Sequence, residues 1–87
     1  MYEITTKSKR AEKQYYEALQ SNSTMSEKLE KLKENPRGCL DAHKLKGKLS
    51  GLWSCWLASD LRMVYKIDDE KKEIILFSVG THKEAYK

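Results

Sequence analysis

Five residues of the chain have side chains suited to proton transfer and to the binding of a phosphate group. They are His43, Asp60, Arg62, His82 and Tyr86. A histidine can donate or accept a proton near neutral pH, and the planar guanidinium of an arginine can hold two phosphate oxygens. The carboxylate of Asp60 can orient a histidine or share the role of a base, and Tyr86 can stack on a nucleobase or donate its hydroxyl proton. If the fold brings them together, these groups can carry out acid–base chemistry at a phosphate ester.

Each of these residues also has a purely structural explanation. His43 precedes alternating leucines and can be a packed, hydrogen-bonded histidine. Asp60 can stabilise a tight turn through bonds to the backbone, and Arg62 can pair with an acid across a sheet. His82 can belong to a loosely held tail. The residue types alone leave both explanations open.

A zinc site is a further alternative, with Cys39, His43, Cys55 and His82 as ligands. Their spacing matches no common pattern of zinc ligands. The sequence also has no Gly-rich phosphate loop, paired-cysteine motif or nucleophilic-serine elbow. We therefore expect no metal and no cofactor, and we expect both cysteines to be reduced thiols in a cytoplasmic protein.

The first half of the chain has the spacing of helices. Residues 1–5, MYEIT, alternate like a short strand, and residues 7–20 place their larger apolar side chains on one helical stripe. A second amphipathic helix is expected from Met25 to the NPRG stretch at residues 35–38. Because the connection between the two helices is short, we expect an antiparallel helical hairpin.

The second half has the alternation of strands. An edge strand or an extended arm with its lysines in water is expected at residues 43–49, followed by strands at residues 52–58, 61–67 and 73–79. The last of these is apolar on both sides, which is typical of an interior strand. In LRMVYKI, the side that should pack on the helices is formed by Leu61, Met63, Tyr65 and Ile67. Arg62 then points away from the core.

These elements predict a single α+β domain over residues 1–87. We expect a short N-terminal strand and a helical hairpin packed on an antiparallel sheet of three or four strands. The chain has 87 residues, so its hydrophobic core is thin. The longest fully apolar run, residues 74–77, is too short to cross a membrane, and we expect no membrane partner.

The net charge of +4 is concentrated in the middle of the chain. Residues 37–66 contain six basic residues but only two acidic ones, Asp41 and Asp60. Such a surplus attracts a polyanion such as RNA, or an acidic protein segment, although it can also be a solvated surface that keeps the protein soluble. The candidate RNA-binding residues are Lys44, Lys46, Lys48, Trp56, Lys66 and Lys83.

The order of these motifs resembles the RelE toxins of bacterial and archaeal toxin–antitoxin pairs, and among them the YafQ branch. The resemblance rests on HKLKGKLSGLWSCWLASDLRMVYKI and on SVGTHKEAY, which together span residues 43–86. The motifs occur in the order His-x-Leu-x-Gly, a turn with Asp, Arg or a neighbour before Val-Tyr, and Gly-Thr-His with an aromatic residue four positions later.

The resemblance implies a ribosome-dependent mRNA endonuclease that needs no metal. In this reaction the ribose 2′-hydroxyl attacks the adjacent phosphate, and a 5′-hydroxyl fragment leaves. His82 or His43 would be acid or base, Arg62 would hold the phosphate, and Asp60 and Tyr86 would assist. The implied partners are mRNA and rRNA in the ribosomal A site, and a cognate antitoxin whose acidic segment wraps the toxin.

The chain departs from the YafQ branch at one position. Where that branch has a second histidine in the sheet, this sequence has Trp56 after Cys55. Trp56 can stack on RNA instead. Two alternatives therefore remain: a ParE-like toxin that inhibits gyrase without catalysis, or a small basic RNA-binding module whose affinity depends on Lys44, Lys46 and Lys48.

Overall fold

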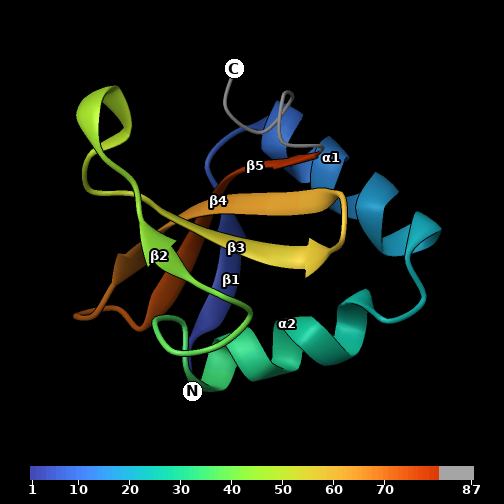
Figure 1. Cartoon of the computed structure of the whole chain (residues 1–87), viewed down its shortest axis with the longest axis horizontal. Coiled ribbons are helices and arrows are strands. Elements are labelled where there is room, and N and C mark those ends of the chain that lie inside the picture. Colours follow the sequence, from blue (N-terminus) through green and yellow to red (C-terminus); the bar gives the residue numbers. More distant parts are fainter. Residues whose placement is uncertain (81–87) are drawn as a thin grey trace.

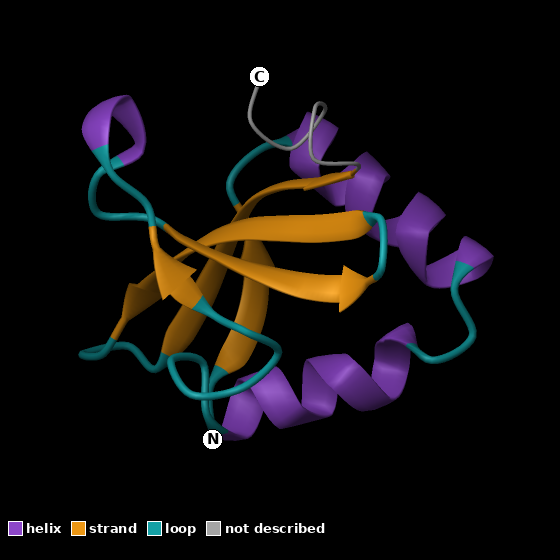
Figure 2. Cartoon of the chain, viewed as in Figure 1, coloured by secondary structure: helices purple, strands orange, loops and turns teal. Residues whose placement is uncertain are grey.

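A computed structural model describes residues 1–80, in which two helices pack on a five-stranded sheet (Figures 1 and 2). The α+β class and the packing of helices on a sheet are confirmed. Among these residues no helix is long and apolar enough to cross a membrane. In chain order, the elements are β1 (Glu3–Thr6), α1 (Lys9–Ser21), α2 (Met25–Glu34), β2 (His43–Lys44), a 3₁₀ turn (Gly47–Leu49), β3 (Trp53–Ala58), β4 (Leu61–Asp68) and β5 (Glu73–Gly80).

The sheet is larger than the expected three or four antiparallel strands, because β1 joins it. The strand order is β1-β5-β4-β3-β2, and β1 runs parallel to β5 while all other neighbours are antiparallel. Ile4 pairs with Ile74, and both pack in the core. This pairing joins the two ends of the described chain, so no local pattern in the sequence predicts it.

Residues 43–49, expected to form an edge strand or an extended arm, form a strand over only two residues, and their three lysines are exposed as expected. Only His43–Lys44 pairs with β3, although β2 does lie at the sheet edge. Gly47 has a φ of 70°, in the left-handed region that glycine adopts easily, and its carbonyl accepts a bond from the amide of Ser50. The 3₁₀ turn that follows interrupts the alternation and leaves Lys46 and Lys48 in a loop.

The interior position expected for β5 is confirmed, and a register shift changes which of its residues face the core. Val64 pairs with Ser78, whereas the next residue, Tyr65, pairs with Leu76, so Phe77 is left without a partner on β4. This extra residue turns both Leu76 and Val79 toward the core, although they are three positions apart.

The two helices cover one face of the sheet. The helix α1 packs chiefly on β5, and α2 packs against β3. Figure 2 shows the two helices diverging from the short loop that joins them. The largest side chains that are fully buried include Tyr65, Met25, Leu32 and Met63, so the inward side predicted for the β4 segment is confirmed.

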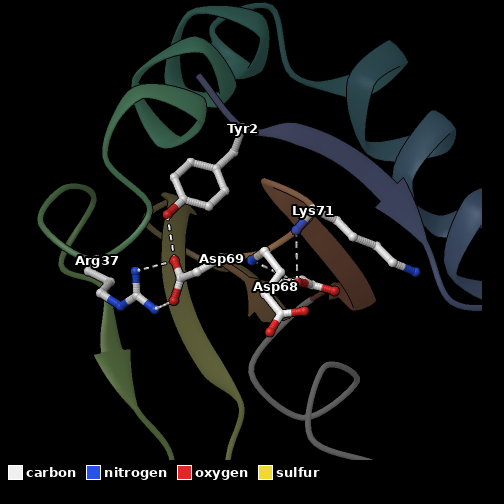
Figure 3. Close-up of polar contacts among 6 residues, drawn as sticks. Tyr2, Arg37, Asp68, Asp69 and Lys71 are labelled. Carbon is white, nitrogen blue, oxygen red and sulfur yellow. Dashed lines mark hydrogen bonds and ion pairs between the residues drawn. The ribbon is translucent and has the colours of Figure 1, made fainter.

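A polar cluster joins three distant segments at one end of the sheet (Figure 3). Asp69, in the turn between β4 and β5, accepts a bond of 2.6 Å from the hydroxyl of Tyr2. The guanidinium of Arg37 donates two further bonds to the same carboxylate, of 3.0 and 2.7 Å. The hydrogen bonds from Arg37 and Tyr2 lower the pKa of Asp69 to about 2. The cluster ties the start of β1 and the loop after α2 to the sheet.

We predict that Tyr65→Phe destabilises the protein by about 1–3 kcal/mol. The buried hydroxyl of Tyr65 donates a 2.7 Å bond to the carbonyl of Pro36, and the substitution leaves this buried carbonyl without its donor. Urea denaturation measures the loss. The control is Tyr16→Phe, because Tyr16 is 56% exposed and should change stability little. Equal stability of the two variants would contradict the role of the buried bond.

We predict a loss of stability in acid that depends on Asp69. Its folded pKa of about 2 lies below the usual value of about 3.9, so the carboxylate stabilises the folded state above pH ~4 and stops doing so as the pH falls toward 2. Thermal unfolding from pH 5 to pH 2 should show a smaller decline in Asp69→Asn than in the wild type. Glu70→Gln, at the exposed neighbouring position, is the control and should decline like the wild type. Because Asp69 is exposed, high salt should reduce the effect.

Candidate functional site

The strand register decides which side chains lie on the face of the sheet opposite the helices, here called the outer face. Cys55 pairs with Met63 in the core, so the next pair along the strands, Trp56 and Arg62, lies on the outer face. Arg62 is in turn paired with Gly80 of β5. One row across three strands therefore contains Trp56, Arg62 and Gly80.

Arg62 stacks on Trp56 within this row. The guanidinium carbon lies 3.7 Å from the centroid of the indole ring, and both residues are half-buried. A guanidinium in this position is attracted to the ring face, while its N–H donors are directed along its own plane. The stack holds a positive charge at a defined position on the outer face, where it can bind an anion such as a phosphate.

His43 belongs to the neighbouring row of the same face. It pairs with Ser54, which in turn pairs with Val64. Strand spacings place the Cα atoms of His43 and Arg62 roughly 12 Å apart, a distance that a bound substrate can bridge. The Nδ1 atom of His43 lies 3.1 Å from the carbonyl oxygen of Asp41. Because a carbonyl only accepts, Nδ1 carries the proton, and Nε2 of the neutral ring can act as a base.

The other expected RNA-binding residues do not gather on the outer face. Lys66 lies there and is exposed. Lys44, by contrast, pairs with Trp53 on the helix side, with its ammonium 5.8 Å from the indole centroid. Lys46 and Lys48 are exposed in the loop after β2.

Asp60 lies near Arg62, whereas the C-terminal candidates lie beyond the described residues. Asp60 is exposed in the turn between β3 and β4, two residues before Arg62, and within residues 1–80 its carboxylate bonds to neither His43 nor Arg62. His82, Lys83 and Tyr86 lie outside the described residues. His82 nevertheless follows Gly80, the β5 partner of Arg62, by two positions in the sequence.

The zinc alternative finds no support among residues 1–80. No three His, Cys, Asp or Glu side chains gather there as metal ligands. Burial raises the pKa of the Cys55 thiol to about 12, so at neutral pH it is protonated and a poor ligand. The thiol of Cys39 donates to the carbonyl of Asn35 at 3.1 Å, and burial raises its pKa as well.

A polar hollow next to the outer face has two charged residues in its wall, Lys28 and Asp41, that are not among the candidates chosen from the sequence. It has a volume of about 360 Å³ and is lined by Lys28, Asp41, Trp56, Ala58 and Ser59. One signal for Lys28 was present in the sequence: it stands three residues after Met25 and four before Leu32, on the apolar side of its helix. The sequence gives no comparable signal for Asp41.

Comparison with known proteins identifies the relatives of this chain. The family model described as bacterial toxin of type II toxin–antitoxin system, YafQ, matches residues 2–87. The chain is 30% identical to a chain of the YoeB–YefM complex from Staphylococcus aureus, with a TM-score of 0.73 over 94% of this chain and 98% of that one. Comparison with curated protein sequences gives no match.

Two further solved structures share the fold. A metal-bound toxin from Helicobacter pylori is 26% identical, with a TM-score of 0.73 over 97% of this chain and 98% of that one. A mutant of YafQ from Escherichia coli, in which a histidine is replaced by glutamine, is 19% identical, with a TM-score of 0.72 over 100% of both chains. At that identity, the E. coli protein shows the likeness of the fold alone.

We predict a measurable energetic coupling between Arg62 and Trp56. A double-mutant cycle of Arg62→Met and Trp56→Leu on the free energy of unfolding should give about 1 kcal/mol, since the 3.7 Å stack is partly desolvated. The control is the cycle of Lys44→Met and Trp53→Leu, whose 5.8 Å contact involves an exposed ammonium and should give less than about 0.5 kcal/mol. Equal coupling energies in the two cycles would show that this stack is no stronger than an exposed cation–π contact.

Proposed function

The chain belongs to the YafQ family of bacterial type II toxin–antitoxin toxins, and on that premise we propose that it is a ribosome-dependent mRNA endonuclease. The single observation that carries the proposal is the row formed by Trp56, Arg62 and Gly80. It fixes a cation on the outer face, beside the strand whose continuation in the sequence contains His82.

Cleavage by the ribose 2′-hydroxyl has three chemical requirements. A base must remove the proton of the hydroxyl as its oxygen attacks phosphorus, positive charge must stabilise the crowded phosphate, and an acid must protonate the departing 5′-oxygen. Side chains of this protein can meet all three requirements, so the proposed reaction needs no metal.

In the proposed mechanism, Arg62 binds the oxygens of the scissile phosphate. Its position on Trp56 is set before substrate arrives, which reduces the reorganisation needed during the reaction. His43, with its proton on Nδ1, presents Nε2 as the base, and His82 supplies the acid. Asp60 and Tyr86 have supporting roles, as an orienting carboxylate and as a stacking or hydrogen-bonding ring. Lys66 extends the positive charge along the same face.

The proposed partners are inferred from the net charge of the chain and from its similarity to a toxin that was solved as a complex. The net charge of +4 favours mRNA and rRNA in the ribosomal A site. The similar S. aureus structure is a complex of YoeB with YefM. We extend this arrangement to the present chain as a cognate antitoxin in the cytoplasm, with an acidic segment that wraps the toxin and neutralises its basic surface.

We predict that Arg62→Ala and His82→Ala each lower the rate of mRNA cleavage at least 100-fold in a reconstituted translation reaction. Arg62→Ala removes the charge at the phosphate, and His82→Ala removes the acid. Primer extension on a translated message measures the cuts. Lys71→Ala is the matched control, because it removes an equal charge from the exposed β4–β5 turn and should cleave like the wild type.

Two results would count against the proposal. Equal cleavage by the wild type and both variants would remove Arg62 and His82 from the site. Growth arrest without cut messages would instead favour a ParE-like toxin that acts by binding another enzyme.

A further inference from the structure

The polar hollow lined by Lys28 and Asp41 lies at the edge of β3 that β2 leaves uncovered. The strand β2 pairs only with Trp53 and Ser54. Two residues further along β3, the amide of Trp56 donates instead to the carbonyl of Leu40, at 2.9 Å. The loop before β2 is thus fastened to the edge of β3, and the hollow lies between this loop, α2 and the end of β3.

The loop has an unusual backbone at this point. Leu40 and Asp41 are consecutive non-glycine residues that both have a φ of 54°, in the left-handed region. Aspartate tolerates this region fairly well, but leucine does not, so the contacts around the loop must hold the conformation. One of these contacts is the bond from Trp56 to the Leu40 carbonyl. The backbone thereby holds Asp41 at the wall of the hollow.

The two charged residues of the hollow keep most of their hydrogen-bonding capacity for a ligand. The ammonium of Lys28 donates to the carbonyl of Leu57 at 2.6 Å, which occupies one of its three protons. Lys28 and Asp41 form no ion pair with each other, and the Asp41 carboxylate has no bonding partner among residues 1–80. A cation and a carboxylate thus line one hollow as separate donor and acceptor.

We propose that this hollow binds a guanine base of the RNA substrate, an inference that rests on the proposed endonuclease function. The Watson–Crick edge of guanine has two adjacent N–H donors, N1–H and N2–H₂, next to the acceptor O6. A carboxylate can accept from both donors at once, and an ammonium can donate to O6. Asp41 and Lys28 supply these two groups.

The other three bases fit this pair of groups less well. Adenine and cytosine each present one amino donor beside a ring nitrogen that only accepts, which would face the Asp41 carboxylate. Uracil has a single N–H between two carbonyl oxygens. In each case a polar group of the protein or of the base is left without a hydrogen-bonding partner. Such an unpaired group lowers the affinity for the wrong base more strongly than a small difference in shape does.

Trp56 connects the hollow to the proposed site of cleavage. It lines the hollow, and its ring also contacts the guanidinium of Arg62. A base held by Asp41 and Lys28 would therefore share one neighbour, Trp56, with the residue that would bind the scissile phosphate. The hollow would then select guanine at a nucleotide next to the cut.

The test is an NMR titration of the free protein with GMP, AMP, CMP and UMP in turn. We expect GMP to shift the amide signals of residues 40–42 and 56–59 and to bind about tenfold more tightly than AMP. In Asp41→Asn this preference should disappear, because the amide keeps only one acceptor. Asparagine tolerates the left-handed backbone, so the variant should keep a folded spectrum. Glu34→Gln, at an exposed carboxylate on α2, is the control and should keep the preference.

A second variant addresses the cation. Lys28→Gln should weaken GMP binding, while Lys31→Gln, at an exposed lysine one turn further along α2, should not. Equal binding of the four nucleotides, or GMP shifts confined to other residues, would overturn the inference.

Mapping of cut sites separates this inference from the proposed function. Wild-type cuts should be enriched next to guanine, and Asp41→Asn should still cut but without this enrichment. If the wild type cuts no message, the endonuclease proposal fails, whatever the titration shows. If it cuts with no preference for guanine, only the base-binding inference fails.

Discussion

The candidate site depends on the antiparallel register of β3, β4 and β5. Side chains alternate between the two faces of a sheet, so a slip of one residue would move Arg62 into the core and Met63 to the outside. The buried pair of Cys55 and Met63 prevents this slip, because both side chains lie in the hydrophobic core. The same packing that stabilises the fold therefore fixes the arginine on the outer face.

Much of the fold is predictable from the sequence because its signals are local. Alternation in LRMVYKI correctly predicts that Met63 and Tyr65 face inward, and the apolar stripes of the helices correctly predict that they pack on a sheet. Two features depend on contacts between distant residues and were not predictable. One is the pairing of β1 with β5, and the other is the register shift at Phe77. The 3₁₀ turn at Gly47 had a local signal, the glycine itself, which the alternation of lysine and leucine obscured.

The sequence predicts the candidate site less completely than the fold. It identifies Arg62 as outward-facing, and the structure adds its stacking partner, Trp56. It groups Lys44 with the RNA-binding residues, yet the register turns Lys44 toward the helix side. Asp41 was missed because its position depends on two left-handed residues and on one bond from the edge of β3. Such arrangements arise from tertiary contacts, which composition and spacing do not reveal.

We propose that side chains of the outer face cleave RNA through attack by its own 2′-hydroxyl. The most direct measurement uses a translated message with a single 2′-deoxynucleotide on the 5′ side of the preferred cut, compared with the unmodified message. We expect the unmodified message to be cut to give a 5′-hydroxyl end, and we expect the deoxy substitution to abolish this cut. Cleavage of the deoxy message at the same position, or fragments with 5′-phosphate ends, would contradict it.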